Sequence, residues 1–177
     1  MSHPLDRPVW SALTSGWAYL AEGDERAWRL NRDYGLFGAP ADGSAESMAA
    51  LTALVPDGGE LWVVDGRPWD APPGTRLAMP PEPVVQMVCE AFVSAGAPDF
   101  EIVSLTEDDA AAMYELAMLT KPGPYVAHTN RLGDFVGVKL DGKLIAMTGE
   151  RMRVPGFTEI SGVCTHPVHR GRGWPEQ

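Results

Sequence analysis

Two tight-turn signals divide the second half of the chain into three segments of strand character. Asp141-Gly142 separates DFVGVKL (134–140) from KLIAMTGERM (143–152), and an Asp-Gly pair between apolar runs is the strongest short-range signal for a two-residue hairpin. Pro155-Gly156 makes a second turn before FTEISGVCT (157–165). Because strands joined by such short turns pair antiparallel, this region predicts a three-stranded antiparallel meander.

A strand and a helix are expected before the meander. FEIVSL (100–105) has the composition of a strand. Thr106 is a suitable N-cap for a helix with three acidic residues in its first turn, where the helix dipole favours negative charge. The Lys-Pro-Gly-Pro run at 121–124 ends that helix. Its buried stripe is expected at Met113, Leu116 and Ala117.

The first 65 residues predict helices and one strand. Apolar residues at spacings of three, four and three predict a helix from Pro8 to near Gly23. Residues 24–34 predict a second, more polar helix or helical turn, Ser44 caps a short helix after it, and LWVVD (61–65) has strand character. The apolar positions of the first helix are Trp10, Leu13, Trp17 and Leu20.

A proline-rich stretch follows and leads to a join. Residues 66–83 contain six prolines, which exclude a helix. VVQMVCEAF (84–92) is ambiguous between strand and helix, and AGAPD (95–99) has the composition of a connection. We therefore divide the chain into an N-terminal α/β segment of unknown role (1–97) and a second domain (98–177).

The overall charge argues against polyanionic partners. The chain has 24 acidic and 14 basic residues, a net charge of −10, which disfavours binding to nucleic acid or to anionic membranes. No run approaches the roughly 18 apolar residues of a membrane span. Cys89 and Cys164, the two cysteines, are too few for a disulfide framework. We expect a cytoplasmic protein.

The C-terminal third is locally basic and contains a glycine-arginine loop. Residues 121–174 hold eight basic and four acidic side chains. Within them, Arg170-Gly171-Arg172-Gly173 follows the last predicted strand, which Pro167 ends. Glycines let successive backbone N–H groups converge on an anion, and arginines add charge-assisted hydrogen bonds to phosphate. The loop therefore suits a diphosphate group.

The loop and the strand before it carry a resemblance to a known family. ISGVCTHPVHRGRG (160–173) resembles the acetyl-CoA-binding signature of the GNAT family of N-acetyltransferases, in particular its FR47-like branch. That pattern is Val-x-x-x-Pro-x-x-Arg-Gly-x-Gly, and the resemblance covers about residues 100–174. The matching positions are Val163, Pro167, Arg170, Gly171 and Gly173.

The resemblance implies how the coenzyme is held. Backbone groups of Val163, Cys164 and Thr165 would pair with the pantetheine arm in the manner of an added strand. The backbone of Arg170–Gly173, together with the Arg170 and Arg172 side chains, would hold the pyrophosphate. The implied reaction is transfer of an acetyl group from acetyl-CoA, as cosubstrate, to a primary amine of a small molecule or peptide.

The amine must lose a proton before it attacks. An alkyl amine has a pKa of about 10, so a base is needed at neutral pH. Glu159 is the first candidate, and Glu150 and His128 follow. The alternative for Glu159 is a carboxylate that faces solvent or pairs with Arg151 or Arg153.

A short run near the C-terminus contains residue types that can bind zinc. Cys164, His166 and His169 supply three potential zinc ligands in six residues. The turn at Pro167 and the absence of an evident fourth ligand argue against convergence, so we expect no metal. Cys164 is interpreted as a small buried hydrophobe.

The sequence departs from the family pattern after Gly173. The family pattern continues with a small residue and a long apolar helix, whereas this sequence reads Trp174-Pro175-Glu176-Gln177. We therefore expect a domain truncated after the phosphate loop, with impaired turnover because the helix dipole and its free N–H groups belong to the anion site. The last meander strand would then have an unpaired edge.

These observations define one principal hypothesis and one alternative. The expected fold is α+β and GNAT-like, a mostly antiparallel sheet with flanking helices, incomplete at the C-terminus and preceded by the N-terminal α/β segment. The expected function is that of an N-acetyltransferase. The alternative is a non-catalytic remnant or interaction module that pairs, in a homodimer for example, through the exposed sheet edge.

Overall fold

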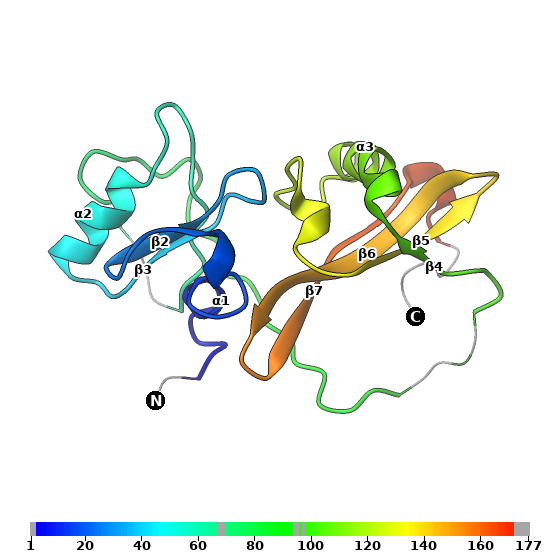
Figure 1. Ribbon diagram of the computed structural model, residues 1–177, viewed down its shortest axis with the longest axis horizontal. Helices are drawn as coiled ribbons and strands as arrows, with labels where there is room; N and C mark the ends of the chain where they lie inside the picture. Colours follow the sequence, from blue (N-terminus) through cyan, green and yellow to red (C-terminus); the bar gives the residue numbers. More distant parts are fainter. Residues whose placement is uncertain (1–2, 67–69, 94–95, 97, 172–177) are drawn as a thin grey trace.

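The computed structural model of the 177-residue chain describes residues 3–66, 70–93, 96 and 98–171. Its second half contains a four-stranded antiparallel sheet with the strand order β4-β5-β6-β7 (Figure 1). The strands are β4 (Val103–Leu105), β5 (Phe135–Leu140), β6 (Lys143–Val154) and β7 (Phe157–Thr165). The last three confirm the predicted meander, and β4 confirms the strand expected at 100–105, in a shorter form.

The two predicted turns have the backbone that their residues favour. Asp141 and Gly142 have φ angles of 50° and 77°, so both central residues of the first hairpin are left-handed, as a type I′ turn requires. In the second turn Gly156 has a φ of 82° after Pro155, the pattern of a type II turn. Local turn chemistry therefore sets the strand pairing next to each turn of the meander.

Helix α3 (Ala110–Thr120) packs on the four-stranded sheet. A short 3₁₀ turn, η2 (Glu107–Asp109), precedes it, and Asp109 accepts a hydrogen bond from the Thr106 backbone N–H at 3.1 Å. Lys121, with a φ of 52°, ends the helix where the Lys-Pro-Gly-Pro run predicts. The expected stripe is buried and shares a core with the sheet, namely Met113, Leu116, Ala117, Phe135, Met147 and Cys164.

The N-terminal part differs from its prediction. It contains α1 (Pro8–Leu13), η1 (Ala18–Leu20), a three-stranded antiparallel sheet and α2 (Ala45–Ala53). The Ser44 hydroxyl accepts a hydrogen bond from Ser47 N, which confirms the cap of α2. The strands are β1 (Ala21–Asp24), β2 (Ala27–Leu30) and β3 (Gly38–Pro40).

Two helix predictions are therefore wrong. The first helix ends at Leu13 rather than near Gly23, and the side chains of Thr14 and Ser15 bond back to carbonyls of its last turn, as these residues do at helix ends. Residues 24–34 include β2 rather than a helix, because Asp24 pairs with Ala27 across a two-residue turn and the segment satisfies its backbone in a hairpin.

One apolar core joins the N-terminal part to the end of β6. In Figure 1 the β6–β7 hairpin extends from the four-stranded sheet toward α1. The Trp17 indole Nε1 donates a hydrogen bond to the Arg151 carbonyl at 3.1 Å. Gly16 allows this approach, since a Cβ there would lie 2.3 Å from the Arg153 carbonyl oxygen. The core includes Val9, Leu13, Trp17, Leu30, Phe37, Leu132, Met152 and Val154.

The described residues between α2 and β4 form neither a helix nor a regular strand. The strand expected at 61–65 is reduced to one parallel bridge between Phe37 and Trp62, and residues 84–92 adopt neither of the two predicted states. The exclusion of a helix from 66–83 agrees with the described part of that stretch. The division of the chain after residue 97 stays a prediction.

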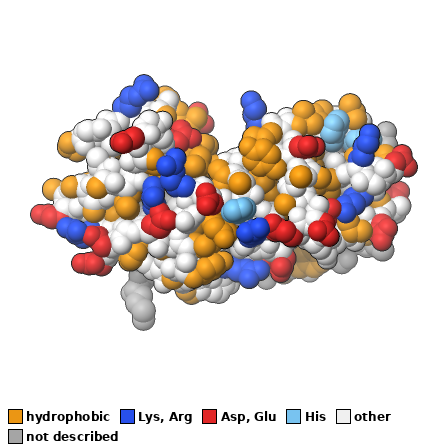
Figure 2. Space-filling view, turned by 45° about the horizontal axis from the view of Figure 1, so that its top comes forward, with side chains coloured by type: hydrophobic (Ala, Val, Ile, Leu, Met, Phe, Trp, Pro, Cys, Tyr) orange, Lys and Arg blue, Asp and Glu red, His pale blue; other side chains and the backbone are white. Residues whose placement is uncertain are grey.

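The surface carries both signs of charge. On the face shown in Figure 2, acidic and basic side chains are interspersed rather than gathered into one basic area. None of the helices in the described ranges has the length and apolarity that crossing a bilayer requires.

Candidate functional site

Strand β7 lies at one edge of the four-stranded sheet and carries a β-bulge. Ser161 pairs with Gly149 and Cys164 with Met147, so Gly162 and Val163 together oppose Thr148. Gly162 has a φ of 65°, a conformation that glycine adopts without strain. In the described sheet, β7 has a strand neighbour on one side, and its other side offers backbone groups to a ligand or a further strand.

The three coenzyme-binding candidates on β7 differ in exposure. The Val163 side chain is 47% exposed, and Cys164 is buried against α3. Burial raises the pKa of the Cys164 thiol, which keeps it neutral and disfavours a nucleophilic role. The interpretation of Cys164 as a small buried hydrophobe is therefore confirmed. The binding of a coenzyme by Val163, Cys164 and Thr165 stays a prediction.

The chain turns back on itself after β7. Pro167 begins a 3₁₀ turn, η4 (Pro167–His169), which ends the strand as predicted. Arg170 Nε then donates a hydrogen bond to the Thr165 carbonyl at 3.3 Å, and Gly171 has a φ of 74°. The structure thus brings the first arginine of the loop beside the end of β7. The candidates Arg172 and Gly173 lie outside the described residues.

Glu159 forms a two-point ion pair with Arg151 on the neighbouring strand. Arg151 Nε and Nη2 donate to the two carboxylate oxygens at 2.9 and 2.7 Å. A second bulge allows this, since Arg151 and Met152 on β6 together oppose Glu159. Arg151 and Arg153 are the two predicted ion-pair partners of Glu159, and in the structure the partner is Arg151. Its role as a base stays a prediction.

Glu150 and His128 belong to other interactions. Arg153 donates a hydrogen bond to Glu150 and lowers the pKa of that carboxyl, which makes Glu150 a weaker proton acceptor. The His128 backbone N–H donates to the Asp33 carbonyl at 2.8 Å, and its ring contacts Tyr34. Neither residue lines the pocket described next.

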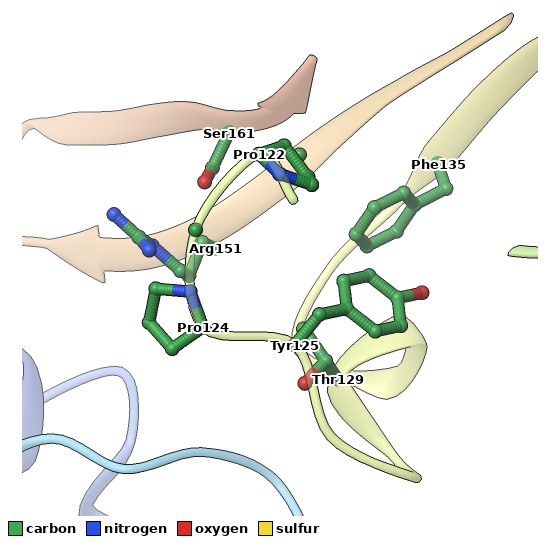
Figure 3. Close-up of a pocket in the computed structure, with 9 residues that line it drawn as sticks. Pro122, Pro124, Tyr125, Thr129, Phe135, Arg151 and Ser161 are labelled. Atoms are coloured by element: carbon green, nitrogen blue, oxygen red, sulfur yellow. The ribbon is translucent and has the colours of Figure 1, made fainter. Parts of the chain in front are cut away.

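A pocket lies beside the β7 bulge (Figure 3). Its empty volume is about 290 Å³, a figure that includes the open solvent at its mouth. The loop after α3 supplies one wall, and β5, β6 and β7 supply the others. The lining residues are Pro122, Gly123, Pro124, Tyr125, Thr129, Phe135, Arg151, Ser161 and Gly162.

Tyr125 closes one side of this pocket. Its ring meets Phe135 edge to face, with centroids 6.4 Å apart. Its hydroxyl is buried and has no hydrogen-bond partner among the described residues, and burial raises the pKa of the phenol. Tyr125 is not predicted from the sequence, because the Lys-Pro-Gly-Pro run before it indicates a helix end and no pocket.

His166 and His169 lie close to each other, with ring centroids 5.7 Å apart. His166 Nδ1 accepts a hydrogen bond from the Val168 backbone N–H at 3.4 Å. Within the described ranges, no group of three or more His, Cys, Asp or Glu side chains is arranged to hold a metal ion.

The fold has a counterpart among solved structures. A crystal structure from Novosphingobium aromaticivorans DSM 12444, of a protein assigned as an acetyltransferase of the GNAT family, matches with a TM-score of 0.80 and 40% sequence identity. The match covers 97% of this chain and 75% of that chain. The chain belongs to the GNAT family. Its fold is the GNAT-like α+β fold expected from the signature, and the match includes the N-terminal part as well.

Other comparisons give no match. No protein-family model matches this GNAT chain, and no curated protein matches it significantly. Membership of the FR47-like branch stays a prediction. Family membership supports a general acetyltransferase activity.

Proposed function

We propose that this GNAT protein transfers an acetyl group from acetyl-CoA to a primary amine. The observation that carries the proposal is the free edge of β7, with its bulge at Gly162 and Val163, leading directly to Arg170 and Gly171. Acetyl-CoA supplies the acetyl thioester. The bulge interrupts the regular pairing of β7 beside the pocket, at the place where an acceptor from that pocket would meet the coenzyme on the edge.

The β7 edge and the loop after it would bind different parts of the coenzyme. The outward backbone groups of Val163–Thr165 suit the amide groups of the pantetheine arm, because an extended ligand adds to a free sheet edge by main-chain hydrogen bonds. Arg170 is placed at the end of that edge and suits the pyrophosphate. Arg172 and Gly173 are included in the proposed pyrophosphate site because of their sequence pattern.

The proton from the acceptor needs a base. In the proposed reaction the amine nitrogen bonds to the acetyl carbon, the carbon–sulfur bond breaks, and the thiolate leaves. Glu159 is the proposed base, acting directly or through water, because its carboxylate lies on the same face of β7 as Ser161 in the pocket wall.

Calorimetric titration of acetyl-CoA into the 177-residue chain tests the coenzyme site. We expect saturable binding that Arg170→Ala weakens roughly 10- to 100-fold, the value of a charge-assisted hydrogen bond. Lys143→Ala is the control, since it removes one positive charge from the exposed β5–β6 turn. Equal affinity for the wild type and Arg170→Ala would exclude the proposed phosphate contact. The impaired turnover expected from the sequence stays a prediction, and release of free CoA thiol by the same sample tests it.

A second candidate function uses the same edge. Ile160 and Val163 on β7 are 67% and 47% exposed, and an apolar edge strand can pair with a second copy of this chain. Sedimentation with and without acetyl-CoA separates the two functions, because coenzyme and partner would compete for one edge. A dimer that acetyl-CoA does not dissociate favours the interaction module. The cytoplasmic location, and the lack of nucleic-acid and membrane partners, stay predictions.

A further inference from the structure

Arg151 gives the pocket beside the bulge its charge. Of the lining residues in the described part of the chain, Arg151 alone is ionised at neutral pH. The others are prolines, glycines, aromatic rings and two hydroxyl side chains. The Arg151 side chain is 18% exposed, so its guanidinium is largely removed from water and interacts more strongly with an anion than a surface arginine does.

Three contacts fix Arg151 in one orientation. Glu159 engages Nε and Nη2, as described above. The guanidinium carbon lies 4.8 Å from the centre of the Phe37 ring, a cation–π contact supplied by the N-terminal part of the chain. The Trp17 indole holds the Arg151 carbonyl. Such a preorganised arginine loses little side-chain freedom when a ligand binds.

The remaining nitrogen of the guanidinium faces the loop after α3. A Cβ built on Gly123 would lie 4.0 Å from Arg151 Nη1, so the missing side chain leaves the space before that nitrogen open. In Figure 3 the guanidinium lies between Ser161 and Pro124, at the side of the pocket away from Phe135. Nη1 is therefore placed to donate to a group that enters the pocket.

We infer that Arg151 binds a carboxylate of the acceptor, which makes the preferred acceptor a small amino acid rather than a simple amine. This inference rests on the proposed acetyl transfer. An α-amino acid carries a carboxylate beside an ammonium group, and the Arg151–Glu159 pair presents the complementary charges side by side. A dianionic phosphate fits less well, because Glu159 would repel its second charge.

Matched acceptors test the inference without any variant. Leucine, leucinamide and isopentylamine share the 3-methylbutylamine unit, and among them leucine alone carries a carboxylate. Release of CoA thiol from acetyl-CoA gives kcat/KM for each. We expect leucine to exceed the other two by roughly 10- to 100-fold, the value of one charge-assisted hydrogen bond.

Two variants then assign the preference to Arg151. Arg151→Gln should reduce the leucine-to-leucinamide ratio to near one, and Arg151→Lys should restore it in part, since lysine keeps the charge but not the planar fork. Arg153→Gln is the matched control, because Arg153 lies on the same strand, pairs with Glu150, and is half-exposed outside the pocket. It should leave the ratio unchanged. Circular dichroism checks that each variant is folded.

A binding measurement separates this inference from the proposed function. Calorimetry with N-acetyl-leucine and N-acetyl-isopentylamine, in the presence of CoA, compares the acid with its analogue without any turnover. Tighter binding of the acid, lost in Arg151→Gln, supports the inference even where turnover is slow. Equal binding or equal use of acid and amine overturns it and leaves acetyl transfer standing. Failure of acetyl-CoA to bind the wild-type chain overturns the proposed function instead.

Discussion

Replacing Trp17 with alanine tests whether the two halves of the chain share one cooperative core. Trp17 is 1% exposed and packs against Phe37, with ring centroids 6.0 Å apart, in the core that also contains Met152 and Val154 of β6. Truncation of a buried tryptophan costs about 3–5 kcal/mol. Part of that cost is the Arg151 carbonyl, which loses its indole donor, and a buried acceptor left without a partner costs about 1–3 kcal/mol.

Urea unfolding followed by far-ultraviolet circular dichroism and by tryptophan fluorescence measures the effect. We expect the two probes to coincide in the wild type and to shift together in Trp17→Ala, because the core spans both sheets. Trp17→Phe keeps most of the ring but removes the donor, and should cost about 1–3 kcal/mol. Trp62→Phe is the control. Trp62 is 37% exposed, and its replacement should change stability by less than about 0.5 kcal/mol.

The result can refute the reasoning in two ways. A shift in Trp17→Ala no larger than that of Trp62→Phe would mean that this core contributes little. Two separate transitions, with only one of them shifted, would show that residues 1–97 unfold as a domain of their own. That second outcome would support the division of the chain expected from its sequence and would contradict a shared core.

Three further predictions concern single groups. Lys139 and the Thr106 N–H lower the pKa of Asp109 below its usual range. The ionised carboxyl therefore stabilises the fold above about pH 4, and this effect is lost as pH falls through its folded pKa. Asp109→Asn should show a smaller loss of Tm than the wild type between about pH 5 and 3. Of the two thiols, Cys89 is exposed and Cys164 is buried with a raised pKa, so a thiol reagent at pH 8 should titrate one group quickly, and two fast thiols would contradict the packing. Glu159→Gln should lower kcat by about 100-fold or more, whereas a change in KM alone would assign Glu159 to holding Arg151.

Local signals account for the parts of the fold that the sequence predicts. The Asp141-Gly142 turn specifies its hairpin through residues adjacent in the chain, and Thr106 and Lys121 mark the two ends of the segment that contains α3. The glycine-arginine loop at 170–173 is predicted in the same way, because its glycines and arginines are consecutive, and its phosphate-binding role stays a prediction. For such features the interacting groups lie within a few residues, and no knowledge of the tertiary structure is needed.

The misplaced elements depend on distant partners. The spacing of Trp10 to Leu20 suits a helix, yet Trp17 leaves the helix to bond a carbonyl 134 residues away. The four residues of β2 are too few for a period of two to be distinguished from a helical one. The pocket was missed for the same reason, since it joins the loop after α3 to Arg151 and Ser161, which are far along the chain.

The two bulges explain how one β-hairpin serves both cores and the pocket. Before the bulge in β6, Met147 faces the core under α3, and a Cβ built on Gly149 would point to the same core. Arg151 lies on the same face of the strand and lines the pocket. After it, Met152 and Val154 turn to the core that contains Trp17. A bulge shifts the alternation of side chains by one residue, so a regular strand could not place Arg151 in the pocket and Met152 in the second core at once. The bulge in β7 lies three residues beyond Glu159 and opens the edge beside the same pocket. The position of Arg151 therefore depends on the packing of the N-terminal part, and variants that loosen that packing should weaken the preference for a carboxylate before they affect binding of acetyl-CoA.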